Sequence, residues 1–109
     1  MSARTTPRNR RPASPRPRWI VKGKIRTLYL GRRIVKRLDQ LAGLQEPVLY
    51  AFEAQGWPQC IANPFTGLGR KRRLHEAIEN LNRHQRTQLI HFYGDGTGTR
   101  ICWRLIAKQ

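Results

Sequence analysis

The segment "FYGDGTGTRICW", from Phe92 to Trp103, constrains the fold most because it places three glycines and an aspartate within five residues. A phosphate-binding loop has its glycines between a strand and the start of a helix, where backbone N–H groups face the anion. Here "TRICWRLI" follows Gly98, alternates with a period of two and is rich in β-branched and aromatic residues. The Lys-Ser/Thr pair of a P-loop and the spacing of a dinucleotide-binding loop are both missing. The segment therefore predicts the turn of a β-hairpin rather than a nucleotide-binding loop.

The alternation also predicts a register for this hairpin. Pairing Phe92 with Ile101 and Ile90 with Trp103 puts these four side chains on one buried face. The other face then carries Leu89, His91, Tyr93, Arg100, Cys102 and Arg104. We expect Asp95 to accept hydrogen bonds from backbone N–H groups within the turn. The hairpin is thus predicted to have an apolar face and a basic face.

Positive charge is concentrated in the N-terminal third of the chain. The net charge is +16, and residues 1–37 hold 13 of the 22 basic residues and none of the six acidic ones. This imbalance indicates a polyanionic partner, with nucleic acid favoured over an acidic membrane surface. The segment "MSARTTPRNRRPASPRPR" (1–18) has no apolar pattern and predicts a disordered basic arm, either a DNA minor-groove arm or a generic charged tail. Residues 19–109 are then expected to form a single domain.

Four further elements are predicted before the C-terminal hairpin. Residues 25–38, "IRTLYLGRRIVKRL", predict a hairpin with a two-residue type II′ turn at Gly31-Arg32, Leu28 opposite Val35, and the flanking cations pointing outward. Those cations are Lys22, Lys24, Arg26, Lys36 and Arg37. Residues 44–58 predict a helix that buries Val48, Leu49 and Phe52 and ends at Gly56. Residues 60–61 predict a short extended piece, and residues 72–85 a second helix with Leu74, Ala77, Ile78 and Leu81 on one apolar stripe.

A helix bearing Asn and Arg, followed at once by a glycine-tipped hairpin, resembles the winged helix-turn-helix family of DNA-binding domains. The N-terminal "LYLGRRIVKRL" is similar to the sheet that precedes the helices in response-regulator effector domains. The segment "LNRHQ…LIHFYGDGTG…ICW" also resembles a group of small uncharacterised bacterial proteins, which supplies no activity. The resemblance implies an α+β, winged-helix-like fold with an N-terminal β-hairpin, two or three helices and a C-terminal β-hairpin wing. A third helix would have to lie within residues 62–72.

The same resemblance implies where nucleic acid would bind. In winged helices the recognition helix enters the major groove and the wing touches the backbone or the minor groove. Helix 72–85 and the hairpin would take these roles, and the basic arm and N-terminal hairpin would add non-specific affinity. The expected nucleic-acid-binding residues are Arg16, Arg18, Lys22, Lys24, Arg70, Lys71, Arg72, Arg73, Asn80, Arg83, His91, Arg100 and Arg104. Of the three tryptophans, Trp19 is the one considered for stacking on a base.

Duplex DNA binding, in a transcriptional or architectural role, is therefore the first hypothesis for function. The alternatives are an RNA-binding or ribosome-associated protein and a protein-interaction module with a basic tail. An enzyme, a metal site, a cofactor and a small-molecule substrate are not expected, because acidic residues are scarce and Cys60 and Cys102 are too few for a disulfide framework or a zinc site. Cys102 would lie opposite His91 by strand pairing alone. With no apolar run long enough to span a membrane, the expected location is the cytoplasm, at the nucleoid if DNA is bound. The target sequence, the oligomeric state and the pathway stay open.

Overall fold

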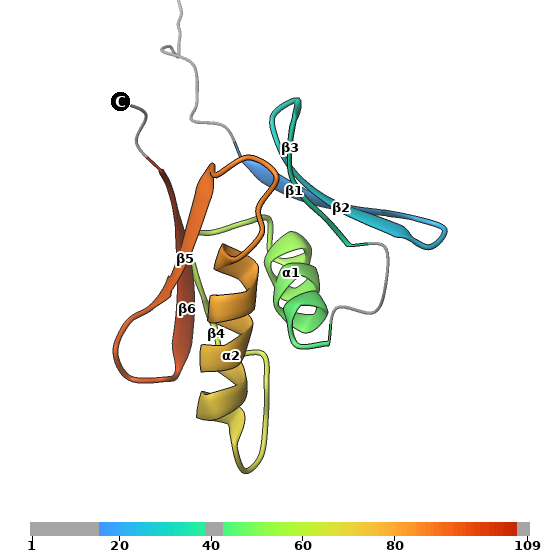
Figure 1. The fold of residues 1–109 in the computed structure, drawn as a ribbon. Coiled ribbons are helices and arrows are strands. Elements are labelled where there is room, and N and C mark those ends of the chain that lie inside the picture. Colours follow the sequence, from blue (N-terminus) through green and yellow to red (C-terminus); the bar gives the residue numbers. More distant parts are fainter. Residues whose placement is uncertain (1–15, 39–42, 107–109) are drawn as a thin grey trace, which may run out of the picture.

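A computed structural model describes residues 16–38 and 43–106 of the chain (Figure 1). This part contains two α-helices and two three-stranded antiparallel sheets. The elements are β1 (Pro17–Lys22), β2 (Ile25–Leu30), β3 (Arg33–Leu38), α1 (Gln45–Ala54), β4 (Cys60–Ala62), α2 (Arg70–Asn82), β5 (Ile90–Gly94) and β6 (Arg100–Leu105). Sheet A has the strand order β1-β2-β3, and sheet B has the order β4-β6-β5. In Figure 1, α1 lies next to sheet A, and α2 lies between α1 and sheet B.

The winged-helix prediction is wrong, although the α+β class is right. A winged helix needs three helices, and residues 63–69, within the range where a third helix would have to lie, form turns and irregular chain. Gly67 and Gly69 have φ angles of 78° and 77°, in the left-handed region that a right-handed helix does not use. Pro64 also disfavours helical conformation for the residue before it. The observed arrangement is two helices between two small sheets.

Sheet A contains the predicted hairpin and one strand that was not predicted. The type II′ turn is confirmed, because Gly31 has φ 61°, Arg32 has no positive φ, and Leu30 pairs with Arg33. The additional strand, β1, begins at Pro17, inside the segment assigned to the arm, and pairs antiparallel with β2. Residues 1–15 of that arm lie outside the described residues.

A β-bulge at Leu28/Tyr29 changes the expected facing of β3. It places Lys36, instead of Val35, opposite Leu28. Lys36 is consequently 6% exposed, and the prediction that it points outward is wrong. Arg26 also turns inward far enough to form an ion pair with Glu46, with 3.2 Å between Nε and Oε2.

The first helix ends as its sequence indicates. Gly56 has φ 80° and donates its N–H to the carbonyl of Glu53, and Trp57 N–H donates to the carbonyl of Phe52. These two bonds form a Schellman cap, and the Trp57 ring stacks on Phe52 with centroids 4.8 Å apart. The cap thereby brings a tryptophan into the core.

The second helix and the C-terminal hairpin have the expected faces but shifted boundaries. Helix α2 covers Arg70–Asn82 instead of 72–85, because Arg83 is extended and His84 adopts a left-handed conformation with φ 55°. In sheet B, Phe92 pairs with Trp103 and Ile90 with Leu105, a register two residues from the predicted one. A shift of two preserves the alternation, so Ile90, Phe92, Ile101 and Trp103 are still buried, as predicted.

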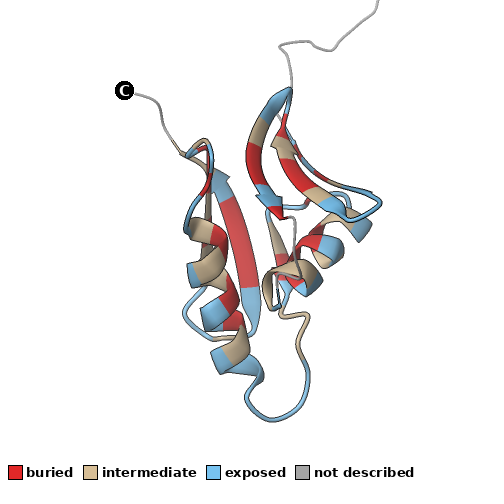
Figure 2. Cartoon of the chain, turned by 45° about the vertical axis from the view of Figure 1, so that its right-hand side comes forward, coloured by how far each residue is buried: buried red, intermediate tan, exposed pale blue. Residues whose placement is uncertain are grey.

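The core lies where the helices meet the sheets, whereas the hairpin turns are exposed (Figure 2). Phe52 of α1 is fully buried between Trp57 and Phe92 of β5, and therefore links α1 to sheet B. Trp19 is 4% exposed and lies edge-on to Tyr50, so it is placed for core packing and not for stacking on a base. Within the described ranges, neither helix is long and apolar enough to cross a membrane.

Candidate functional site

The start of α2 and the turn of the β5–β6 hairpin are joined by Asn63. Its Nδ2 donates to the carbonyls of Arg70, at 3.1 Å, and Gly98, at 3.2 Å, and its backbone N–H donates to Thr99 O at 2.8 Å. Gly98 also lies directly against Lys71, since a Cβ at this glycine would be 2.8 Å from both Cγ and Cδ of the lysine. Two segments that are far apart in the sequence therefore form one unit.

This unit presents four exposed basic residues, Arg70, Lys71, Arg72 and Arg100, which we call the basic end. The first three occupy the first turn of α2, and Arg100 begins β6 two residues after Gly98. In Figure 1 the start of α2 and the hairpin turn lie together at the lower end of the molecule. The structure thus groups four of the predicted binding residues.

Arg73, also predicted to contact nucleic acid, is engaged within the protein. Its guanidinium donates to the carbonyls of Leu68, at 2.9 Å, and Thr66, and it lies 5.6 Å from the centroid of the Phe65 ring. These contacts hold the 63–69 segment against the first turn of α2. Arg73 therefore holds the basic end in position, and its guanidinium is less available to a partner than the four exposed cations.

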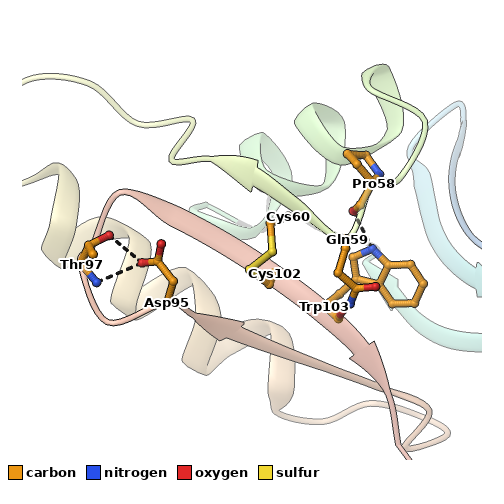
Figure 3. The surroundings of a disulfide bond; sticks show 7 residues. All are labelled: Pro58, Gln59, Cys60, Asp95, Thr97, Cys102 and Trp103. Carbon is orange, nitrogen blue, oxygen red and sulfur yellow. Dashed lines mark hydrogen bonds between the residues drawn. A yellow bond between two sulfur atoms is a disulfide. The ribbon is translucent and has the colours of Figure 1, made fainter.

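The hairpin turn is held by Asp95, as predicted. One carboxylate oxygen accepts from Thr97 N–H at 3.0 Å and from Thr97 Oγ1 at 2.6 Å (Figure 3). The hydrogen bonds from the Thr97 hydroxyl and N–H, with the charge of Arg100, lower the pKa of Asp95 below its usual value. The aspartate thus stays ionised and fixes the turn next to the basic end.

A groove of about 700 Å³ runs between α2 and β5 and reaches the hairpin turn. One wall is a helical stripe of Lys71, His75, Ile78 and Asn82, which recur at three- and four-residue spacing. The opposite side is formed by β5 and the turn, and its lining residues are His91, Phe92, Tyr93, Gly94, Gly96, Thr97 and Gly98. We call this cavity the α2–β5 groove. Its mixture of cations, rings and apolar groups suits an amphipathic ligand.

Two amide side chains close the outer edge of β5 beside this groove. Asn82 Nδ2 donates to Phe92 O at 2.9 Å, and Phe92 N–H donates to Asn82 Oδ1 at 2.8 Å. Gln85 makes the equivalent pair with Ile90 and further bonds to Leu81 and Leu89. These side chains take the place of a neighbouring strand, which protects an otherwise open sheet edge.

His91 and Tyr93 lie on the same face of β5, with nearly parallel rings 6.1 Å apart. His91 pairs across the strands with Arg104, and Tyr93 pairs with Cys102, so the expected Cys102–His91 pairing is wrong. Arg104 is exposed on this face, whereas His91 and Tyr93 are half-buried beside the groove. His75, on the facing helix, was not among the predicted binding residues because only the fold brings it opposite β5.

Cys60 and Cys102 form a disulfide between β4 and β6, a bond that was not predicted because two cysteines were judged too few for a disulfide framework (Figure 3). They occupy directly opposed positions of the two strands, with Cα atoms 4.0 Å apart. The ladder bonds flank this pair, since Trp103 N–H donates to Gln59 O and Asn63 N–H donates to Thr99 O. The pair is therefore a non-hydrogen-bonded position, where opposed side chains are closest. A 42-residue separation and a three-residue partner strand left no sequence signal for it.

The remaining predicted residues lie away from the basic end. Arg16 and Arg18 lie at the start of sheet A, where Arg18 Nε is 3.0 Å from Glu53 Oε2, and Lys22 and Lys24 flank the exposed β1–β2 turn at the right of Figure 1. Asn80 and Arg83 lie at the other end of α2, about 15 Å along the helix from its first turn. The predicted residues therefore form separate groups instead of one continuous surface.

Lys36, which was predicted to point outward, is a buried cation. Its amine donates to Asn80 O in the last turn of α2, where the helix dipole is negative. Burial lowers the pKa of Lys36 from 10.5 to about 8. Because the side chain is enclosed, it joins sheet A to α2 and is not available to a large partner.

Comparison with known proteins identifies no relative that would assign this site. No protein-family model matches the chain, and neither the curated proteins nor the solved structures yield a match. The chemistry of the basic end and of the groove is therefore the basis for interpreting function.

Proposed function

We propose that this protein binds nucleic acid, with duplex DNA as the expected form, through the basic end. The observation that carries the proposal is the double hydrogen bond of Asn63 to Arg70 and Gly98, which holds the start of α2 against the hairpin turn. Arg70, Lys71, Arg72 and Arg100 are exposed around this junction. A rigid cluster of cations at a helix start is suited to phosphate oxygens, because the helix dipole adds to the side-chain charges.

The proposal assigns the contact to the start of α2 and not to its whole length. Glu76 and Glu79 are exposed on the helix, and Glu79 pairs with His75 at 3.3 Å. Carboxylates on that surface would repel phosphates if the helix lay along a DNA groove. The start of α2, with the hairpin turn beside it, brings cations to the backbone without these carboxylates.

The cations of sheet A supply a second, non-specific contribution in this proposal. Lys22 and Lys24 are exposed at the β1–β2 turn, and the net charge of the whole chain is +16. Charge of this kind favours encounter with a long polyanion at any position along it. With DNA as the partner, the proposed location is the nucleoid within the cytoplasm.

The test is the salt dependence of binding to a duplex of about 20 base pairs, a length that covers a typical site. We expect the triple variant Arg70→Gln/Lys71→Gln/Arg72→Gln to weaken binding and to reduce the slope of log K against log salt by about 0.9 for each phosphate that is no longer neutralised. The matched control removes three exposed charges from sheet A, in the variant Arg32→Gln/Arg33→Gln/Arg37→Gln.

Equal losses of affinity in the two triple variants would mean that net charge, and not the basic end, determines binding. Undetectable binding of the unaltered protein to the duplex at low salt would overturn duplex DNA as the ligand. Tighter binding to duplex RNA of the same sequence would instead favour the RNA-binding alternative. If neither duplex binds, a protein-interaction module with a basic tail becomes the better explanation.

A further inference from the structure

The outer edge of β5 is closed at two positions and open at the next. Residues of alternating position in a strand point their backbone N–H and C=O groups to the same side. Ile90 and Phe92 both point away from β6, toward the amides of Gln85 and Asn82. The next residue with this orientation is Gly94, and none of the residues that the structure describes donates to or accepts from its backbone on that side. The edge therefore offers one free donor and one free acceptor.

This free pair lies in the α2–β5 groove, among groups that suit a flat, polar ring. Gly94 lines the groove together with Tyr93, His91 and Ile78. Gly94 is exposed, and the position of a Cβ on it would be 3.7 Å from Ile78 Cδ1, an ordinary contact distance, so this residue lies directly beside the helix wall of the groove. Lys71, a member of the basic end, lines the same groove. Rings, an aliphatic side chain, a hydrogen-bonding edge and a cation are thus within one cavity.

We propose that the groove receives one unpaired nucleobase of the bound nucleic acid, an inference that rests on the proposed function. The base would pair its edge with the N–H and C=O of Gly94, as the amide of Asn82 pairs with Phe92. Its face would lie against Tyr93 and Ile78, and its phosphate would reach Lys71. A base in a duplex has already used its Watson–Crick edge, so the ligand is a nucleotide at an overhang, a gap or a single-stranded segment.

The backbone pair sets little preference among the bases. Each of the four bases has a donor and an acceptor side by side on its Watson–Crick edge, and each has a π-face for stacking. The chemistry therefore predicts recognition of unpaired nucleotides without a strict sequence requirement. The basic end would hold the adjoining phosphates, whatever their sequence.

The experiment compares a blunt duplex with the same duplex carrying a short single-stranded overhang, by fluorescence anisotropy with the full chain. We expect the overhang to tighten binding by about tenfold, the typical gain from stacking one base on a side chain. Gly94→Pro removes the N–H and should abolish this gain while leaving binding to the blunt duplex unchanged. The matched control is Gly94→Ala, which keeps the N–H and places its Cβ at ordinary contact distances of 3.7 Å.

Tyr93→Ala provides a second route, because it removes a ring without altering the backbone of β5. It should also reduce the gain from the overhang, and thermal unfolding shows whether either variant has lost its fold. If the blunt duplex binds but the overhang adds nothing, the groove inference is wrong and the proposed function stands. If neither DNA binds, the proposed function fails first. A gain that persists in both Gly94→Pro and Tyr93→Ala would place the unpaired base elsewhere and overturn the inference.

Discussion

Sheet A and sheet B are both three-stranded and antiparallel, but they are attached to the helices by different chemistry. In sheet A the attachments are charged, because Glu53 accepts from Trp19 N–H and from Arg18, and Lys36 donates to the end of α2. In sheet B the attachment is neutral, because the amides of Asn82 and Gln85 bond the edge of β5, and a disulfide joins β4 to β6 within the sheet itself. The two sheets should therefore respond to different changes in conditions.

The difference separates the effects of pH from those of reducing agents. Amides and disulfides do not titrate over the ordinary pH range, whereas a carboxylate and a buried amine do. Sheet A is expected to weaken in acid and to be insensitive to a reductant. In sheet B the amide attachment to α2 is expected to be insensitive to pH and the disulfide to be sensitive to a reductant, while the hairpin turn that Asp95 holds is expected to loosen in acid.

The largest expected effect comes from removing the disulfide. Cys60 and Cys102 are 42 residues apart, and a cross-link closing a loop of this length contributes about 4 kcal/mol by limiting the unfolded chain. The double variant Cys60→Ala/Cys102→Ala should lose about that much free energy of unfolding, measured with urea. A reductant should destabilise the unaltered protein and leave the double variant unchanged. If neither the double substitution nor the reductant changes the free energy of unfolding, the disulfide does not stabilise sheet B as proposed.

A second effect concerns the buried amide at the edge of β5. Gln85 is 7% exposed, and Gln85→Leu would leave the carbonyl and N–H of Ile90 without their partners. Burying such unpaired groups should cost about 2–3 kcal/mol at any pH between 5 and 9, whereas Gln88→Leu, at an exposed position nearby, should change stability by less than about 0.5 kcal/mol. Chemical denaturation across this pH range measures both. A loss for Gln85→Leu that grows or vanishes with pH would contradict the neutral character assigned to sheet B.

Local sequence patterns predicted most of the elements that depend on residues close together in the chain. The type II′ turn at Gly31, the cap at Gly56 and the buried face of the β5–β6 hairpin were all foreseeable, because each depends on neighbouring residues. Strand β1 was missed because it follows an Arg- and Pro-rich segment and is stabilised by pairing with β2 and by Glu53. The family resemblance rested on the order of elements, and the turns at residues 63–69 contradict the fold it implied.

The candidate site was predicted in composition but not in arrangement. Arg70, Lys71, Arg72 and Arg100 were predicted as binding residues, but their grouping depends on the bonds of Asn63, which was not among them. The inward direction of Lys36 depends on a one-residue bulge, which no periodic pattern reveals. His75 becomes a groove residue only when α2 packs beside β5. Long-range contacts of this kind carry no local signal.

A third prediction concerns the carboxylate that attaches sheet A to α1. Burial alone would raise the pKa of Glu53. Hydrogen bonds from Trp19 N–H, Trp57 Nε1 and Arg18, together with the charge of Arg18, outweigh this effect, so the pKa lies below its usual 4.5. A depressed pKa in the folded state contributes stability above about pH 4.5, which is lost as the pH falls through the folded value. Glu53→Gln should therefore cost about 1 kcal/mol at pH 7 and progressively less in acid. A constant difference between the two proteins from pH 7 to pH 3 would show that the charge of Glu53 has no part in the attachment.

The smallest expected effect comes from replacing Lys36, which should increase stability, unlike the replacement of Glu53, and should depend on alkaline instead of acidic pH. The pKa of Lys36 is lowered to about 8 in the folded protein and is 10.5 when the side chain is free, so burial of its charge opposes folding at neutral pH. Between these two values the unfolded chain holds the proton more often than the folded one, and stability should rise with pH. Lys36→Met fills the same buried position without a charge, so it should stabilise the protein by about 1 kcal/mol at pH 7 and by less at pH 10. Thermal unfolding at the two pH values measures the difference, with the exposed Arg37→Met as the control. A loss of stability at both pH values would mean that the bond from Lys36 to Asn80 O outweighs the cost of burying the amine. The charged attachment of sheet A would then stabilise the protein in the same way as the amide attachment of sheet B.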